Sequence, residues 1–185
     1  MNSEKSITST SKFLSLILRH TPEKIGLILD NEGWARIEDI IRLSRAHGTQ
    51  LNLELIQTVV ATNDKKRFAI SDDGACIRAN QGHSLANIDL NMQRVDPPEF
   101  LFHGTATRFI DSIRTTGLTP ESRNHVHLSQ DHETAVRVGT RHGNPIVLVV
   151  RALMMHKAGF SYYRSENGVW LTDNVPTMFI DFPAG

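Results

Sequence analysis

Two polar segments, far apart in the chain, carry side chains that suit a phosphate group. Arg19 and His20 follow an apolar run, and a second segment extends from Arg78 to Ser84. Guanidinium and imidazole groups beside flexible or helix-ending backbone gather hydrogen-bond donors around a phosphate dianion. Gly82, in the second segment, permits a ligand to approach the backbone closely. We therefore expect the second segment to bind a phosphorylated substrate through Asn80, Gln81 and His83.

Each segment also has a simpler explanation. Arg19 and His20 could mark a cationic helix C-terminus, where positive charge complements the helix dipole. Residues 78–84 could be a solvated loop with a structural glycine. Because arginine and histidine commonly end helices, the first pair indicates a phosphate site only in combination with the second segment.

Two further segments place histidines beside apolar strands. His103 to Thr105 follow a predicted strand, and the central Gly104 would let a flat ligand lie against the backbone. The freed N–H and C=O groups could then bind a carboxamide. Polar and apolar residues alternate over residues 125–129, so His125 and His127 face the same side of a strand.

A metal site is the alternative for these histidines. His125 and His127 could bind zinc, and His132 and His142 lie nearby in the sequence. No group of cysteine or acidic residues has a recognisable ligand spacing, so we favour hydrogen bonding and expect no metal. Residues 139–143 are too loose for a dinucleotide fingerprint, and neither a Walker motif nor G-x-G-x-x-G occurs. Any dinucleotide site is therefore not a Rossmann site.

The composition excludes several classes of protein. With 39% hydrophobic residues among 185, the chain can bury a core, and its 20 basic and 20 acidic side chains cancel. Binding to nucleic acid must therefore come from a local cluster of charge. The single cysteine, Cys76, excludes an internal disulfide and fits a reducing compartment. No signal peptide or membrane-spanning run is visible, so we expect a soluble cytoplasmic protein with no membrane partner.

The first half of the chain must position the two phosphate-binding segments, and its pattern predicts helices followed by a hairpin. Apolar residues at helical spacing indicate three helices, with Asn52 as the N-cap of the third. Two short strands flank an Asp-Asp-Gly turn. Three helices and a β-wing describe a winged-helix lobe. The expected helices cover residues 13–18, 36–47 and 52–60, and the strands cover 67–71 and 75–79.

The second half has the mixed strands and few helices of an α+β lobe. A polar stretch over residues 84–99 ends in Asp-Pro-Pro-Glu, which cannot lie inside a helix or central strand. We therefore expect two domains, residues 1–94 and residues 95–185. The expected strands cover residues 100–103, 145–151, 162–163, 169–172 and 178–182, and the helices lie near 109–113 and 131–138.

Together and in this order, the motifs resemble the NAD-dependent RNA 2′-phosphotransferase family, from about Ser11 to Val175. The resemblance implies an α+β fold in which an N-terminal winged-helix lobe and a C-terminal ADP-ribosyltransferase-like mixed β lobe face each other across a cleft. It also implies a catalytic set of Arg19, His20, Arg78 and Arg123. The residues expected to bind NAD are His103, Gly104, Thr105, His127, Leu128 and Ser129, to which we add Arg141 and Gly143.

The resemblance implies a reaction in two steps. An internal 2′-phosphate of RNA attacks the nicotinamide-bearing ribose carbon of NAD, which gives nicotinamide and ADP-ribosylated RNA. The ribose 2″-hydroxyl then attacks phosphorus and releases RNA with a free 2′-hydroxyl and ADP-ribose 1″,2″-cyclic phosphate. In fungi, members of this family act after tRNA splicing. Relatives that modify proteins typically need a catalytic glutamate near the end of the fold to activate the acceptor. A phosphate is already nucleophilic, which fits the lack of a glutamate between Trp170 and Pro176.

Two other functions stay open from the sequence. The first is an ADP-ribosyltransferase that caps phosphorylated nucleic-acid ends and stops after the first step. The second is a winged-helix RNA binder without catalysis, which the neutral net charge and the lack of an aromatic platform disfavour. Whether the chain is a 2′-phosphotransferase or an end-capping ADP-ribosyltransferase, we expect a monomer that takes NAD as co-substrate.

Overall fold

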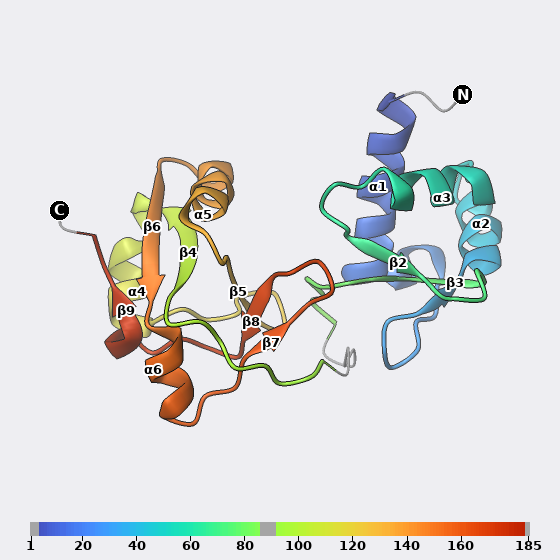
Figure 1. Ribbon diagram of the computed structural model, residues 1–185. Coiled ribbons are helices and arrows are strands. Elements are labelled where there is room, and N and C mark those ends of the chain that lie inside the picture. Colours follow the sequence, from blue (N-terminus) through green and yellow to red (C-terminus); the bar gives the residue numbers. More distant parts are fainter. Residues whose placement is uncertain (1–3, 86–91, 184–185) are drawn as a thin grey trace. The chain divides into compact units, whose positions relative to one another are not determined.

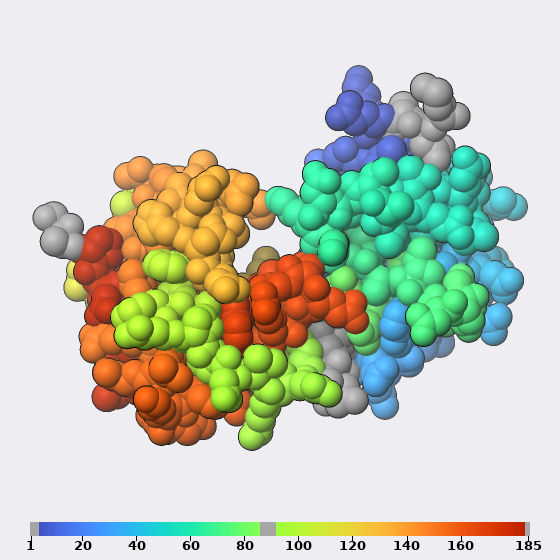
Figure 2. Space-filling model, viewed as in Figure 1, coloured from blue at the N-terminus to red at the C-terminus, as the bar shows by residue number. Residues whose placement is uncertain are grey.

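The computed structural model of the chain describes residues 4–85 and 92–183, which belong to two units, residues 1–91 and 92–185 (Figures 1 and 2). The polar stretch expected to link the domains, residues 84–99, includes residues 86–91, which lie outside the described residues. In the described ranges, no helix is long and apolar enough to cross a membrane.

The first unit combines three α-helices with a three-stranded antiparallel sheet (Figure 1). The expected helices and the expected hairpin are all present, and the short strand β1 was not predicted. Across the sheet the strand order is β1-β3-β2. In chain order the elements are α1 (Glu4–Arg19), η1 (Pro22–Ile25), β1 (Ala35–Arg36), α2 (Ile37–Ala46), α3 (Leu53–Ala61), β2 (Phe68–Ile70) and β3 (Cys76–Ala79).

The periodicity of α1 explains why Arg19, at its end, does not point into the core. Leu14, Ile17 and Leu18 are buried completely and form the stripe that packs into the core. Arg19 is the last residue of the helix and lies off this stripe, so its side chain leaves the core. The third helix begins as expected, because the Asn52 side chain accepts a hydrogen bond of 2.8 Å from the Leu55 N–H.

The second unit contains two three-stranded antiparallel sheets and three short α-helices (Figure 1). One sheet has the order β4-β6-β9 and the other β5-β8-β7. The helices are α4 (Ile110–Thr116), α5 (His132–Gly139) and α6 (Ala152–Lys157). The strands are β4 (Leu101–Ala106), β5 (Val126–Leu128), β6 (Pro145–Val150), β7 (Tyr163–Arg164), β8 (Trp170–Thr172) and β9 (Ile180–Asp181), and the 3-10 turns are η2 (Thr107–Phe109), η3 (Thr140–His142) and η4 (Thr177–Phe179).

Two expectations for the second unit were wrong. Residues 178–182 do not form one strand, because a 3-10 turn at Thr177–Phe179 precedes β9 and is closed by a hydrogen bond of 3.0 Å from Phe179 N–H to Pro176 C=O. Helix α6 was not predicted, since it starts directly after the apolar strand β6 and has only six residues. A helix this short shows too little periodicity to be recognised.

Helix α5 packs unusually close to β4 through a pair of glycines. A Cβ atom added to Gly104 would overlap the carbonyl oxygen of Ala135 in α5. A Cβ atom on Gly139, at the end of α5, would lie 2.7 Å from the carbonyl oxygen of Thr105. Neither position has room for a side chain, so these glycines let the backbone of α5 lie directly on the backbone of β4.

Candidate active site

Arg19 lies where the end of α1 meets the segment that follows β3. One of its Nη atoms is 3.5 Å from the Arg67 carbonyl oxygen, and the guanidinium carbon lies 5.9 Å from the centre of the Phe68 ring. Gly82 has a φ of +86°, and its Cβ position would be in van der Waals contact with the Arg19 side chain. The segment after β3 therefore packs directly under this arginine.

Arg78, on β3, lies over the face of Trp34. Its guanidinium carbon is 4.6 Å from the ring centre, within the range of cation–π attraction, which contributes about 0.5–2 kcal/mol. The strand register explains the pair, because Ala35 lies opposite Ile77 and this brings Trp34 beside Arg78. The aromatic face restricts the orientation of the arginine without neutralising its charge.

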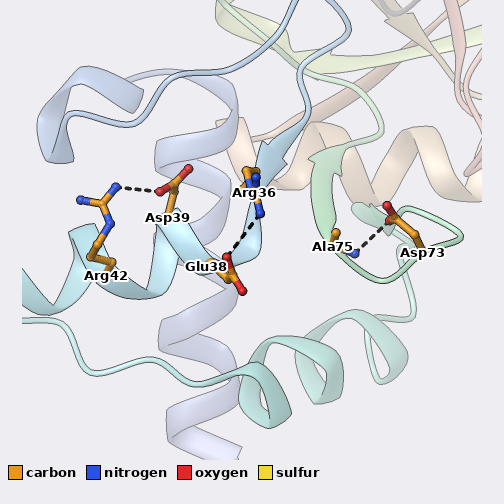
Figure 3. Close-up of polar contacts among 6 residues, drawn as sticks. All are labelled: Arg36, Glu38, Asp39, Arg42, Asp73 and Ala75. Carbon is orange, nitrogen blue, oxygen red and sulfur yellow. Dashed lines mark hydrogen bonds and ion pairs between the residues drawn. The ribbon is translucent and has the colours of Figure 1, made fainter.

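Other arginines of the first unit are placed differently. Arg36 pairs with Glu38 at 3.4 Å and Arg42 pairs with Asp39 at 2.7 Å, both on exposed surface (Figure 3). Such exposed pairs contribute little to stability. Arg19 and Arg78 lie against aromatic rings instead.

His20 and Ser84 join the two segments that the sequence analysis combined. The His20 Nδ1 atom lies 2.9 Å from the Ser84 hydroxyl oxygen, and the Ser84 N–H donates to the Arg19 carbonyl at 3.0 Å. The backbone bond satisfies one of the carbonyls that a helix end leaves without an intrahelical partner. Residues 19 and 20 are therefore held against residues 82–84.

His83 is buried between these cationic groups. Its side chain is only 3% exposed, and within the described residues its Nε2 atom has no hydrogen-bond partner. Burial lowers the pKa of His83 from 6.5 to about 4, and the positive charges of Arg19, His20 and Arg78 act in the same direction. The histidine is therefore neutral at physiological pH. We call Arg19, His20, Arg78 and His83 the cationic cluster.

Asn80 supports the neighbouring turn. Its side-chain N–H donates to the Lys66 carbonyl at 2.7 Å, and its backbone N–H donates to the Arg67 carbonyl at 2.9 Å. Lys66 has a φ of 41°, a conformation that costs a non-glycine residue free energy and must be held by its surroundings. Gln81 lies half-buried next to Asn80. Asn80 thus orders the turn that underlies Arg19.

In the second unit, His103 is held by a backbone carbonyl. Its Nδ1 atom lies 3.1 Å from the His127 carbonyl oxygen, so Nδ1 carries the hydrogen and Nε2 of the neutral ring is an acceptor. Burial lowers the pKa of His103. The hydrogen bond to the His127 carbonyl acts in the opposite direction, and the charge of His142 lowers the pKa further. His127 is fixed locally, with Nδ1 3.0 Å from the His125 carbonyl oxygen.

Gly104 presents its backbone at a strand edge. Phe102 exchanges two backbone hydrogen bonds with Ser129, of 2.9 and 2.8 Å, on the side away from β6. Alternate residues of a strand direct N–H and C=O to the same edge, so those of Gly104 point to that side too. Neither group has a hydrogen-bond partner in residues 4–85 or 92–183. The strand edge thus offers one donor and one acceptor side by side.

Arg123 and Arg141 are close enough to influence each other. Although Arg123 is partly exposed, partial burial lowers its pKa, and the charge of Arg141 adds to this effect. The remaining predicted residues of this unit lie around β4 and β5. Thr105 and Leu128 are buried, Ser129 is bonded to Phe102, and Gly143 adopts a φ of 136° beside Ala106.

Known proteins resemble the chain over nearly its whole length. Residues 5–174 match the family described as RNA 2′-phosphotransferase, Tpt1 / KptA family. A probable RNA 2′-phosphotransferase of Rhodopirellula baltica is 53% identical over 183 residues, which is 99% of this chain and 100% of the relative. The chain belongs to the RNA 2′-phosphotransferase family. Proteins of the same description from Pectobacterium carotovorum and Escherichia coli O45:K1 are 57% and 50% identical, over 92% and 97% of this chain and 92% and 93% of their own lengths.

Family membership confirms the resemblance expected from the motifs and makes the chain an enzyme, a transferase. Among the residues that the structure describes, no three His, Cys, Asp or Glu side chains are grouped as a metal site. The four residues expected to be catalytic fall in both units of this family member. Arg19, His20 and Arg78 gather in the first unit, and Arg123 lies in the second.

The sequence analysis missed three contributors to the cationic cluster. Trp34 and Phe68 were not among the expected site residues, but each lies against one of the arginines. Ser84 was included in the polar segment without a role, and it contacts His20. The signal for Trp34 is its place directly before β1, which becomes visible only once β1 is paired with β3.

Proposed function

We propose that the chain removes an internal 2′-phosphate from RNA and transfers it to NAD. In this proposal the first unit is a winged-helix lobe that binds the RNA phosphate, and the second is an ADP-ribosyltransferase-like lobe that binds NAD. The helix and strand order of the first unit, with a hairpin after α3, supports the winged-helix assignment. The protein would act in the cytoplasm as a monomer.

The cationic cluster is the observation that carries the proposal. Arg19, His20 and Arg78 each lie near enough to His83 to lower its pKa, in addition to the effect of burial. Gathering like charges is unfavourable unless an anion offsets their repulsion. A phosphate dianion supplies that charge, and arginine binds it with two parallel hydrogen bonds. The neutral His83 can add a further donor without adding charge.

The strand edge at Gly104 fits the carboxamide of nicotinamide. A carboxamide carries an acceptor and a donor on the same carbon, which complements the N–H and C=O that Gly104 directs to one side. His103 Nε2 is an acceptor and can bind a ribose hydroxyl. The other residues proposed for NAD are Thr105, His127, Leu128, Ser129, Arg141 and Gly143.

The chemistry requires positioning and charge neutralisation more than proton transfer. The RNA 2′-phosphate attacks the ribose carbon that carries nicotinamide, so nicotinamide leaves and ADP-ribosylated RNA forms. The ribose 2″-hydroxyl then attacks phosphorus, and RNA with a free 2′-hydroxyl leaves together with ADP-ribose 1″,2″-cyclic phosphate. Arg19, His20, Arg78 and Arg123 would hold the phosphate and stabilise the charge that rearranges at phosphorus.

The test is release of nicotinamide from NAD in the presence of three RNAs. We expect release with an oligoribonucleotide bearing an internal 2′-phosphate and none with the matching 2′-hydroxyl RNA. Nicotinamide release with a 5′-phosphorylated end, without loss of the phosphate, would favour the end-capping alternative instead. A parallel reaction with a chelator should proceed at the same rate, and inhibition that zinc or magnesium reverses would contradict a metal-free reaction.

A further inference from the structure

A groove of about 520 Å³ runs along α1 in the first unit. One side is formed by α1, from Ile7 to Leu16, and by His20 just after the helix, and the other by the end of α3 and the turn at residues 62–67. Helices α1 and α3 lie side by side (Figure 1). The floor of the groove reaches the core, because Val59 lines it and Ile7 packs against the core.

The α1 side of the groove is unusually rich in hydroxyl groups. Thr8, Ser11 and Ser15 line it together with Lys12. Residues three or four apart share one face of a helix, so these side chains form a row. From Thr8 to Ser15 the row is roughly 10 Å long at 1.5 Å per residue. Hydroxyl and ammonium groups at this spacing are donors for successive phosphates.

The opposite side is a turn whose shape is fixed by Asn63. Its Oδ1 atom accepts hydrogen bonds from the backbone N–H groups of Lys65 at 3.2 Å and Arg67 at 3.5 Å. Its Nδ2 atom lies 3.4 Å from the Ser11 hydroxyl oxygen and so connects the turn to α1. The groove is therefore formed before any ligand binds, which lowers the entropic cost of binding.

The charge of the groove is positive. Lys12, Lys65 and Arg67 line it together with a single acidic residue, Asp64. The chain as a whole has equal numbers of basic and acidic side chains, so this local excess is not a consequence of composition. A polyanion fits this surface better than a peptide of mixed charge.

The groove is continuous with the cationic cluster. His20 lines the groove and also contacts Ser84. Arg67 lines the groove, and its carbonyl oxygen is the one that Arg19 approaches at 3.5 Å. If a phosphate of a bound polyanion lies at Arg19 and His20, the neighbouring residue of that polyanion therefore reaches the groove.

We propose that this groove, the α1 groove, holds the sugar–phosphate backbone of the single-stranded RNA that flanks the 2′-phosphate. The inference rests on the proposed function, since the cluster must hold the 2′-phosphate for the neighbouring nucleotides to reach α1. The groove offers donors to phosphates and no aromatic platform for bases, so it recognises backbone and not sequence. A longer RNA should therefore be a better substrate than a dinucleotide.

The experiment compares kcat/KM for a 2′-phosphorylated dinucleotide and for a longer oligoribonucleotide with the same central modification. Wild-type protein should favour the longer RNA. In the Lys12→Gln/Lys65→Gln variant this preference should fall roughly tenfold at about 0.15 M salt, because two phosphate contacts on a single strand contribute about 1.4 to the slope of log K against log salt. For the longer RNA, the slope of log K against log salt should become shallower by about 1.4 in the double variant.

Arg45→Gln is the matched control, since Arg45 is exposed on α2 and does not line the groove. A preference that survives in the double variant, or that falls equally in the control, would overturn the α1 groove. So would an equal loss on both substrates. Affinity for the longer RNA without NAD is measured by fluorescence anisotropy. If the protein has no activity on any 2′-phosphate but its affinity still depends on Lys12 and Lys65, the groove stands and the proposed reaction fails.

Discussion

The two units present their candidate residues in different ways. In the first unit the important atoms belong to side chains: Arg19 and Arg78 lie on aromatic faces, and His83 is buried among positive charges. In the second unit they belong largely to the backbone, because Gly104 directs its N–H and C=O to a strand edge and His103 is held by a carbonyl. The first unit thus offers side-chain charge, and the second offers backbone hydrogen-bonding groups, to the ligands proposed for them.

This difference decides which changes each unit tolerates. Under the proposed function, we expect removal of a guanidinium from the first unit to affect activity more than the fold. Adding a single methyl group at Gly104 would disturb the packing of α5 on β4 before any ligand is considered. Side-chain truncation therefore tests the first unit, and backbone crowding tests the second.

The largest expected effect is on catalysis by Arg78→Ala. Loss of one charge-assisted donor typically reduces the rate by about 10²–10³-fold. Charge rearranges at phosphorus in the second step, so we expect that step to suffer more and ADP-ribosylated RNA to accumulate. Arg78→Lys should restore activity only in part, because an ammonium cannot form two parallel hydrogen bonds.

The measurement is gel separation of RNA after reaction with NAD labelled in its adenylate. Arg36→Ala is the control, because this arginine pairs with Glu38 on exposed surface (Figure 3). We expect the same accumulation from at least one of Arg19→Ala, His20→Ala or Arg123→Ala. The division between the steps is wrong if all four variants slow both steps equally and no labelled RNA appears.

The second prediction concerns the acid stability of the first unit. The pKa of His83 is about 4 in the folded protein and 6.5 otherwise, so the unfolded chain binds the proton first as pH falls. Stability is therefore complete above pH 6.5 and is lost progressively down to about pH 4, by about 3 kcal/mol in total. His83→Gln should flatten this dependence.

Denaturation followed by Trp34 fluorescence isolates this effect, because the chain has two tryptophans and Trp170→Phe removes the signal of the second unit. His47→Gln, at an exposed position after α2, is the control and should keep the wild-type slope. An unchanged slope in His83→Gln would show that burial, aided by the neighbouring positive charges, does not hold His83 neutral.

The third prediction compares one glycine from each unit. Gly104→Ala should destabilise the second unit by about 3 kcal/mol, the upper range for crowding in a packed interior. Gly82→Ala should cost the first unit only about 1 kcal/mol, because Arg19 is at normal contact distance and only the left-handed backbone is strained. Denaturation is followed by the fluorescence of Trp170 for Gly104→Ala and of Trp34 for Gly82→Ala. Equal losses of stability in the two variants would contradict the comparison.

The sequence predicted the secondary structure well where periodicity was strong. The cap at Asn52 places the start of α3 correctly, and the stripe Leu14, Ile17, Leu18 marks α1, although α1 begins at Glu4 and not near residue 13. The two-residue strand β1 and the six-residue helix α6 carry too few residues for a pattern. Residues 178–182 were apolar enough for a strand, but Pro176 starts a turn there.

Residue types in the candidate site could be predicted, but their supports could not. Arg19 and Arg78 were identified from their polar neighbours, whereas the aromatic faces beneath them depend on strand register. Gly104 was interpreted as an opening for a ligand, and the structure adds that its missing side chain admits α5. Packing between elements distant in sequence leaves no local pattern to detect.

The bonds between Ser84 and the end of α1 also bear on how the protein is made. The contacts described for the cationic cluster join residues 19 to 84, and none of them involves the second unit. Chains are synthesised from the N-terminus, and domains fold largely as units as they emerge. The cationic cluster can therefore be assembled on the ribosome while the second unit is still being translated.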